Sequence, residues 1–230
     1  MATLFIESAD GVGAVDGGTP TTGTTTFSTA ASLTGLTFSN LQKKDGNLSF
    51  HVNTATALSP SPVMIFGSGL TQAYVRAYIY PPAAPSGSTY FMSARTFDNT
   101  KKAADLRFNA DLTVTARDGI ATTITSTGTA LAANAWNRVE WGVKPAASGS
   151  YQYLRLFVGS NVDGLTPDFE SLLGTCSSAI ATDVGRFVFG LSTAAIYEYF
   201  FDIIQGDDTT WVGPVASVAS FSFAHTVTVG

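Results

Sequence analysis

The stretch WNRVEWGVKPAASGSYQYLRLFV, residues 136–158, constrains the fold of this chain more than any other. Its two halves alternate apolar and polar residues, and the KPAASGS segment between them contains proline, glycine and serine, which favour a hairpin loop. Successive strand side chains point to opposite faces of a sheet, so one face of this hairpin is apolar and the other carries arginines and tyrosines. The stretch therefore predicts two antiparallel strands with one face in a core. The predicted core includes Trp136, Val139, Trp141, Val143, Leu154, Leu156, Val75 and Ile79.

The rest of the sequence continues this pattern. Of the 230 residues 45% are hydrophobic, enough for a sizeable core, and only 13% are charged. Short alternating or apolar runs recur at regular spacing, and no amphipathic helix of useful length separates them. This pattern is typical of an antiparallel sandwich or barrel. Besides the hairpin, strands are expected at 3–6, 47–52, 63–66, 71–80, 90–95, 104–109, 112–117, 120–125, 186–191 and 196–204.

The two ends of the chain differ from its body. Residues 1–24 read as a short strand followed by a Gly/Thr-rich arm with little apolar content. Residues 25–214 form the body, in which 159–183 is expected to be a polar loop with one helical turn at SLLG. The tail 215–230 alternates again, with Phe221, Phe223, Val227, Val229 and also His225 on one parity. It is either a last strand of the body or a strand offered to another subunit.

Charge and cysteine content exclude several classes of protein. The net charge of −5 and a pI near 4.8 argue against nucleic acid as the main ligand. No apolar run is long enough to span a membrane, so membrane insertion is not expected. Cys176 is the only cysteine, which rules out an intrachain disulfide and suggests a small semi-buried filler. The N-terminus lacks a secretory signal pattern, and a soluble protein of a reducing compartment is expected.

The second half of the chain carries a family resemblance. Trp136 opens a strand, RFVFG follows at 186–190, and the strand YFFDIIQGD at 199–207 precedes WVGP. Over roughly residues 25–214 the chain resembles the concanavalin A-like, laminin-G-like jelly-roll family. The resemblance implies an all-β, antiparallel jelly-roll β-sandwich. It also places Asp202 in the last strand, where we interpret it as structural and bonded to backbone at the sheet end.

Catalytic and metal-binding patterns are missing from the sequence. Glycan hydrolases of this fold use a signature like E-x-D-x-x-E, which nothing here matches. Glu198 and Asp202 share a strand face but are separated by about 13 Å of extended chain, whereas glycosidase carboxylates lie about 5–9.5 Å apart. The loop acids Asp163, Asp168 and Glu170 could hold calcium or simply be solvated. The two histidines, His51 and His225, do not make a zinc site with one cysteine. No metal, cofactor or catalytic residue is predicted.

One set of residues suggests a contact surface. Three predicted strands carry an arginine at mid-strand on the polar parity, with aromatic neighbours. If the strands are neighbours, one outer face combines aromatic rings and guanidinium groups, which are enriched in protein interfaces and also suit sugar rings. The alternatives are a protein interface, a glycan-binding face, or cross-strand pairs that only stabilise the sheet. The residues of this putative interaction face are Tyr74, Arg76, Tyr78, Arg138, Tyr153 and Arg155.

Three functions follow from these observations. In composition the chain looks like the laminin-G-like structural proteins of tailed bacteriophages, which form minor tail proteins, fibres and capsid decorations. This resemblance implies a non-enzymatic virion structural protein, assembled in the host cytoplasm, that contacts other virion proteins and itself as a homo-oligomer through its two ends. The alternative is a carbohydrate-binding module that recognises a cell-surface glycan. The third is a glycoside hydrolase or lyase that depends on Glu198.

Overall fold

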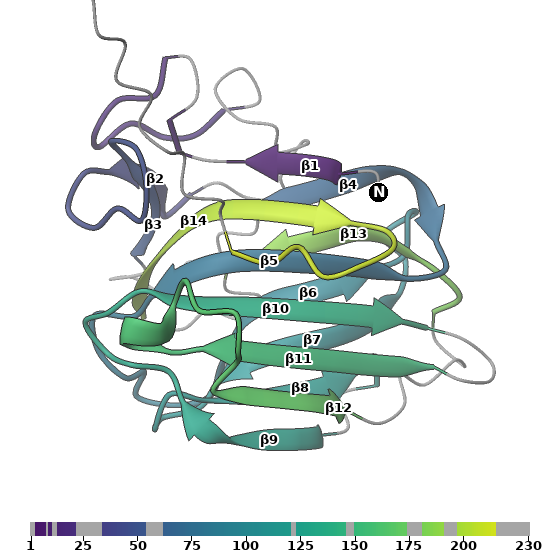
Figure 1. Ribbon diagram of the computed structural model, residues 1–230. Coiled ribbons are helices and arrows are strands. Elements are labelled where there is room, and N and C mark those ends of the chain that lie inside the picture. Colours follow the sequence, from purple (N-terminus) through teal and green to yellow (C-terminus); the bar gives the residue numbers. More distant parts are fainter. Residues whose placement is uncertain are drawn as a thin grey trace, which may run out of the picture.

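The computed structural model describes residues 3–7, 9–10, 13–21, 34–53, 62–120, 123–145, 150–173, 181–190 and 197–214. Its described elements are strands, apart from one turn of 3-10 helix, η1 (Gly159–Asn161). The strands form two antiparallel sheets that pack face to face (Figure 1). Within the described part of the chain, no helix is long and apolar enough to cross a membrane.

The first sheet has eight strands. Its order is β12 (Phe169–Leu173), β11 (Tyr151–Phe157), β10 (Asn137–Lys144), β5 (Ala73–Tyr80), β14 (Glu198–Asp207), β3 (Ser49–Asn53) and β2 (Leu36–Ser39). The eighth strand, β1 (Thr3–Glu7), pairs with the second half of β14, whose first half pairs with β3. The predicted N-terminal strand therefore belongs to the sheet of its own chain.

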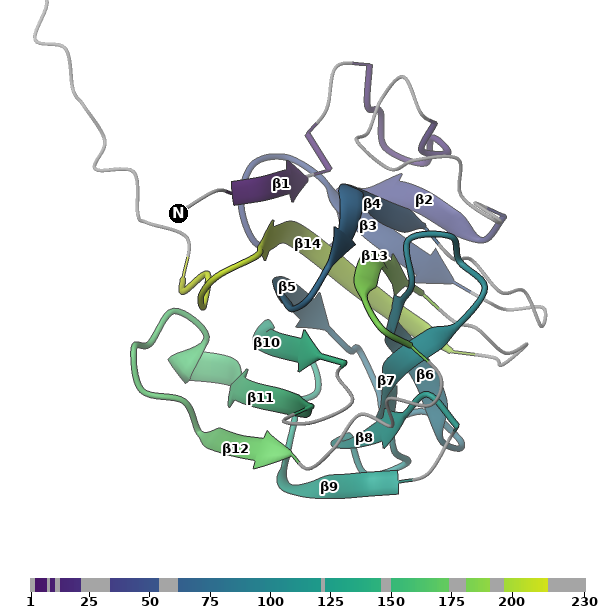
Figure 2. The same cartoon turned by 90° about the vertical axis from the view of Figure 1, so that its right-hand side faces the viewer.

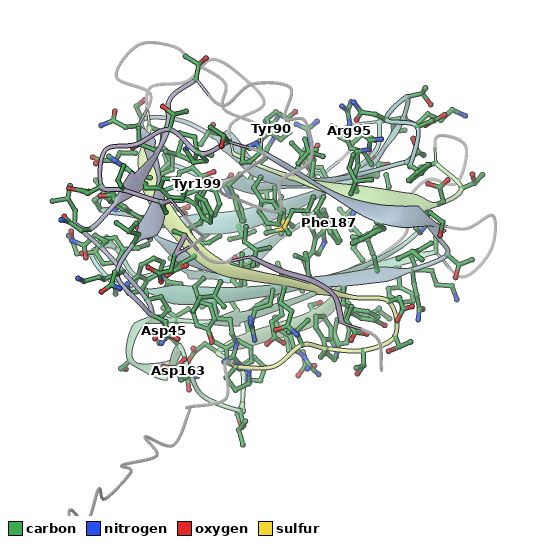
Figure 3. All side chains as sticks on the ribbon, turned by 90° about the horizontal axis from the view of Figure 1, so that it is seen from above. Asp45, Tyr90, Arg95, Asp163, Phe187 and Tyr199 are labelled. Atoms are coloured by element: carbon green, nitrogen blue, oxygen red, sulfur yellow. The ribbon has the colours of Figure 1, made fainter. Side chains whose placement is uncertain are left out.

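The second sheet has six strands, and it lies across the core from the first (Figure 2). Its order is β4 (Val63–Leu70), β13 (Val184–Phe189), β6 (Thr89–Arg95), β7 (Lys102–Phe108), β8 (Thr113–Asp118) and β9 (Thr123–Ala130). Side chains from both sheets meet between them, as Trp141 of β10 and Phe187 of β13 do with ring centroids 5.7 Å apart. Phe187 and Tyr199 lie in this layer between the sheets (Figure 3).

The predicted hairpin is confirmed. β10 and β11 are antiparallel neighbours, with Val139 opposite Leu156 and Trp141 opposite Leu154. The predicted core residues are buried with one exception, Trp136, which is only half-buried. Its even position places it on the opposite face from Val139 and Trp141, where it donates a hydrogen bond to the carbonyl of Lys43 at 3.1 Å. Its assignment to the core was wrong.

Three other elements differ from the expectation. β2 was not among the predicted strands. β12 lies inside the segment predicted to be a polar loop, and it includes Ser171–Leu173, so the helical turn predicted at SLLG was wrong; five residues are too few to show a clear alternation. The strand predicted at 120–125 begins later, at Thr123, and runs to Ala130. The tail 215–230 with His225, and also Cys176, lie outside the described residues, so the predictions for them stay predictions.

Candidate functional site

The six residues of the putative interaction face come from three adjacent strands. β10 pairs with β5 on one side and with β11 on the other, so residues two apart on β10 form successive rows across the sheet. The sequence could not show this adjacency, because β5 is distant from the hairpin in the chain. The rows are Tyr78, Arg138 and Phe157; Arg76, Glu140 and Arg155; and Tyr74, Gly142 and Tyr153.

The first row is covered by the loop that follows β11. Arg138 is 1% exposed and donates hydrogen bonds to the carbonyls of Val162 and Gly164, at 2.9 and 2.7 Å. Its guanidinium carbon lies 3.5 Å from the ring centroid of Phe157, and its Nε forms an ion pair with Glu140 at 3.0 Å. Arg138 therefore fastens this loop to the sheet.

In the second row, Arg76 is covered by the chain that follows β14. After β14 the chain turns back over the sheet, and we call residues 208–214 the cover segment. Arg76 donates to the carbonyl of Gly213 at 2.6 Å and to the amide oxygen of Gln205 at 2.9 Å. Burial lowers the pKa of the Arg76 guanidinium, which donates both of these hydrogen bonds.

Half of the predicted face is thus internal. Arg76, Tyr78 and Arg138 are at most 2% exposed and bond to their own chain, so they cannot contact another molecule while the cover segment and the β11 loop are in place. Their hydrogen bonds run mainly to the covering segments, which the alternative of cross-strand pairs did not include. Alternation along the strands predicted that these side chains point away from the core. It could not predict that they are buried, because the segments that cover them come from elsewhere in the chain.

The two tyrosines of the third row, Tyr74 and Tyr153, remain partly exposed, and a further aromatic residue joins them. Trp211 of the cover segment makes edge contacts with Tyr74 and Tyr153, at centroid distances of 5.1 and 4.9 Å. The guanidinium carbon of Arg155 lies 4.3 Å from the Trp211 ring. We call this half-exposed group the aromatic rim. It consists of Tyr74, Tyr151, Tyr153, Arg155, Glu170 and Trp211.

Gly142 makes this arrangement possible. A Cβ atom at this position would lie 2.7 Å from the ring of Tyr74 and 3.7 Å from that of Trp211. Real Cβ atoms do not approach other atoms as closely as 2.7 Å, so any other residue would displace the Tyr74 ring. The glycine in the predicted strand WNRVEWGVK therefore provides room for a ring from the next strand.

The polar groups of the rim are held in place by hydrogen bonds to one another. Glu170 of β12 accepts hydrogen bonds from the hydroxyl of Tyr153 and from Arg155 Nε, the latter at 2.8 Å. These donors lower the pKa of Glu170, and the same bond raises the pKa of Tyr153. The hydroxyls of Tyr74 and Tyr151 are 2.9 Å apart. The rim thus presents ring edges next to an ionised carboxylate and a guanidinium.

Three members of the rim were missed from the sequence. Tyr151 is the first residue of β11, where only Tyr153 and Arg155 were assigned to the face. Trp211 lies beyond the last predicted strand, and Glu170 lies in the segment predicted to be a loop. The motif WVGP drew attention to Trp211 only as the end of the body. Its position over β5 and β11 depends on the turn of the chain after Asp207, which no local pattern specifies.

The candidate catalytic acids are held apart in different environments. Glu198 is partly exposed and hydrogen-bonded to His51, whose Nε2 is 2.8 Å from its carboxylate. Asp202 is fully buried and accepts backbone hydrogen bonds from Ile203 at 2.8 Å and Lys44 at 3.3 Å. The interpretation of Asp202 as a backbone-bonded structural residue agrees with these contacts. Its location differs, because it sits at a bulge within β14 rather than at the sheet end.

Asp202 has a strongly shifted titration. Burial raises its pKa to about 7, against the opposing effect of the backbone donors at Ile203, Asp45, Lys44 and Ala9. Those donors come from three separate segments, so this carboxyl group joins the N-terminal region and the 40–47 loop to β14.

The loop acids do not converge. Asp163 pairs with Lys44 at 2.6 Å, and Asp168 accepts from the backbone of Val158 at 2.7 Å. Glu170 belongs to the rim. In the part of the chain that the structure describes, no group of three or more His, Cys, Asp or Glu residues is placed to hold a metal ion.

Comparison with known proteins gives the fold and no closer relationship. No family model matches the sequence, and no curated protein matches it. The globular domain of Trypanosoma cruzi calreticulin superposes with a TM-score of 0.51 over 91% of this chain and 89% of that domain, at 7% identity. The chain has a concanavalin A-like jelly-roll fold.

Two further structures show weaker likeness. A glycosyl hydrolase family 16 protein from Mycobacterium smegmatis matches over 90% of this chain and 100% of its own, with a TM-score of 0.47 and 14% identity. A sialidase from Trypanosoma rangeli, in complex with the inhibitor DANA, matches over 75% of this chain with a TM-score of 0.46 and 11% identity. The chain spans about a quarter of that sialidase, 27% of its length.

Proposed function

We propose that this chain is a non-catalytic carbohydrate-binding module and that the aromatic rim is its glycan site. The observation that carries the proposal is the half-exposed group of Trp211, Tyr153 and Tyr74 beside the Arg155–Glu170 pair. Apolar faces of sugar rings pack on aromatic rings, and their hydroxyls bond to paired, charge-assisted donors and acceptors. Both kinds of group are held in place before a ligand arrives, which limits the entropy lost on binding.

The absence of turnover is part of the proposal. Glu198 is engaged with His51, and Asp202 is buried among backbone donors. Neither carboxylate belongs to the aromatic rim, so a glycan bound there would meet no acid–base pair among the described residues.

A glycan array with the full chain tests this function. Tyr153→Ala removes one ring of the rim, and we expect it to reduce the affinity for any bound glycan about tenfold or more. Phe97→Ala is the matched control, because Phe97 is also an exposed aromatic (42%) but lies on a turn of the other sheet. A wild type that binds no glycan, or a Tyr153→Ala variant that binds as the wild type does, would refute the proposal.

A structural role in a virion is the second candidate, and one observation favours a protein contact. Leu165 and Leu172 are 85% and 66% exposed, and Leu172 lies on β12, an edge strand of the eight-stranded sheet. Large exposed apolar residues at a sheet edge suit contact with another chain. The bacteriophage setting comes from the resemblance of the sequence alone and stays a prediction.

Self-association can be measured directly. If β12 contacts a second copy, the full chain will have the mass of an oligomer in light scattering, and Leu172→Glu will shift it to the monomer. Leu41→Glu is the control, since Leu41 is equally exposed (69%) but lies outside the strands. A monomeric wild type would remove the support for this contact.

A further inference from the structure

The outer face of the six-stranded sheet is basic, although the protein as a whole is acidic. Outward-facing residues of four adjacent strands, β13, β6, β7 and β8, contribute five of the chain's twelve lysines and arginines. We call this surface the basic face. Its cations are Arg95, Lys102, Arg107, Arg117 and Arg186. Tyr90 and Arg95 lie on this side of the molecule, and Asp45 and Asp163 lie on the opposite side (Figure 3).

Three of these cations form one row of like charge. Arg186 of β13 is directly opposite Arg95 of β6, which is in turn opposite Lys102 of β7. Like charges at directly opposed positions destabilise a sheet. Neighbouring strands lie about 5 Å apart, so the row places the backbone positions of three cationic residues within about 10 Å.

A single buried acid, Asp105, partly balances the positive charges of the basic face. Asp105 contacts Lys102, and its carboxylate lies 3.8 Å from Arg107 and 3.6 Å from Arg117. It supplies one negative charge against five positive ones. Two further acids, Asp98 and Asp183, lie at the edge of the face, where they accept hydrogen bonds from the turn at 96–100.

The two arginines beside Asp105 retain unused donors. Within the described ranges, neither Arg107 nor Arg117 donates a side-chain hydrogen bond to a protein acceptor, and the buried Nε of each faces Asp105 beyond hydrogen-bond distance. A buried guanidinium donor without an acceptor is costly. The Arg107 and Arg117 side chains are nevertheless 20% and 11% exposed, so an external oxyanion that bonds to the accessible part of each guanidinium would relieve the repulsion along the row.

We propose that the basic face binds an acidic polysaccharide, through carboxylate or sulfate groups along its chain. The surroundings favour this ligand over single-stranded nucleic acid, which is bound largely by stacking bases on aromatic rings. The Tyr90 ring is covered by the Arg107 guanidinium, whose carbon lies 3.6 Å from the ring centroid, so that this side of the ring offers no platform for a base. Asn109, Thr113 and Ser126 beside the cations supply neutral polar groups for sugar hydroxyls.

This site is separate from the aromatic rim, which lies on the other sheet. The two proposals therefore succeed or fail independently: Tyr153→Ala will leave binding to the basic face unchanged, and loss of arginines from the basic face will leave binding at the rim unchanged.

Binding of the full chain to heparin and polygalacturonate tests the inference, with dextran as the neutral polymer and oligothymidylate as the nucleic acid. We expect both acidic polysaccharides to bind, with an affinity that falls as salt rises, and dextran not to bind to this face. Replacement of both Arg107 and Arg117 by Gln should weaken binding about a hundredfold, about tenfold for each charged contact. Lys43→Gln, which removes an exposed charge outside the face, is the matched control and should have no effect.

A second variant separates binding from folding, because Arg107 and Arg117 also flank buried Asp105. Arg95→Gln removes one of two opposed arginines, so it should weaken binding about tenfold while the melting temperature of the free protein stays equal or rises. No binding of either polysaccharide, or unchanged binding by Arg95→Gln and by the double variant, would overturn the inference. Equal or tighter binding of oligothymidylate at equal charge would also overturn it.

Discussion

Asp202 is a buried acid whose pKa lies well above its ordinary value. Its carboxyl group is completely buried, yet it bonds to backbone from three segments of the chain. An acid whose pKa is raised in the folded state stabilises the fold below its unfolded pKa. That contribution is lost as the pH rises through the folded value. For Asp202 this stabilisation is lost between about pH 4, near the pKa of an ordinary aspartate, and about pH 7, its raised pKa in the folded protein.

We predict that Asp202→Asn reduces the pH dependence of stability. In the wild type the free energy of unfolding should fall between pH 5 and pH 8, with Asp202 contributing on the order of 2–3 kcal/mol of this fall. Burial raises the pKa of Asp105 and Glu140 as well, so the variant should keep part of the decline. Urea denaturation at several pH values measures the difference. An identical decline in wild type and Asp202→Asn would show that Asp202 does not titrate in this range.

At the scale of elements, β10 is notable because both of its faces are buried. The odd positions from Asn137 to Val143 face the core, as the alternation predicted, but Arg138 and Glu140 on the even positions are each 1% exposed. The pair is enclosed by the loop after β11, to which Arg138 donates two hydrogen bonds. A buried ion pair contributes little net stability, but loss of one partner leaves an unpaired buried charge.

Replacement of one partner should therefore cost more than replacement of both. We predict that Arg138→Met destabilises the protein by about 3–5 kcal/mol, and that adding Glu140→Leu recovers most of this loss. Unfolding in urea of the two single variants and the double variant gives the coupling energy. Additive effects of the two substitutions would mean that Arg138 acts through the loop carbonyls rather than through Glu140.

For the whole molecule, the N-terminal strand β1 pairs with the part of β14 that β3 does not cover. β1 pairs with the second half of β14, and Asp10, soon after it, accepts hydrogen bonds from the backbone of Asn47 and Leu48. The first residues therefore act as part of the body, although their composition predicted an arm for neighbouring subunits. Without β1, the Ile204–Asp207 part of β14 would present unpaired backbone groups.

Deletion of residues 1–7 should accordingly lower stability and promote aggregation. We expect the melting temperature to fall by several degrees, which corresponds to about 1–2 kcal/mol for a domain of this size. Thermal unfolding and light scattering measure both effects. Deletion of residues 215–230 is the comparison. If that tail serves another subunit, its loss will change the oligomeric mass and leave the melting temperature of the body unchanged.

The amino-acid sequence alone is enough to predict the class of fold and most of the strands. Alternation along a strand follows directly from side-chain geometry, so the hairpin at 136–158 and its core residues could be read from the chain, with Trp136 the exception because its parity places it on the other face. The sequence also indicated that Tyr74, Tyr153 and Arg155 share an outward parity.

What it could not determine was which strands become neighbours and which outward faces are then covered. Those depend on contacts between distant segments: the cover segment on Arg76, the β11 loop on Arg138, and Trp211 beside Tyr74. Only the tertiary structure therefore separated the buried half of the predicted face from its accessible rim.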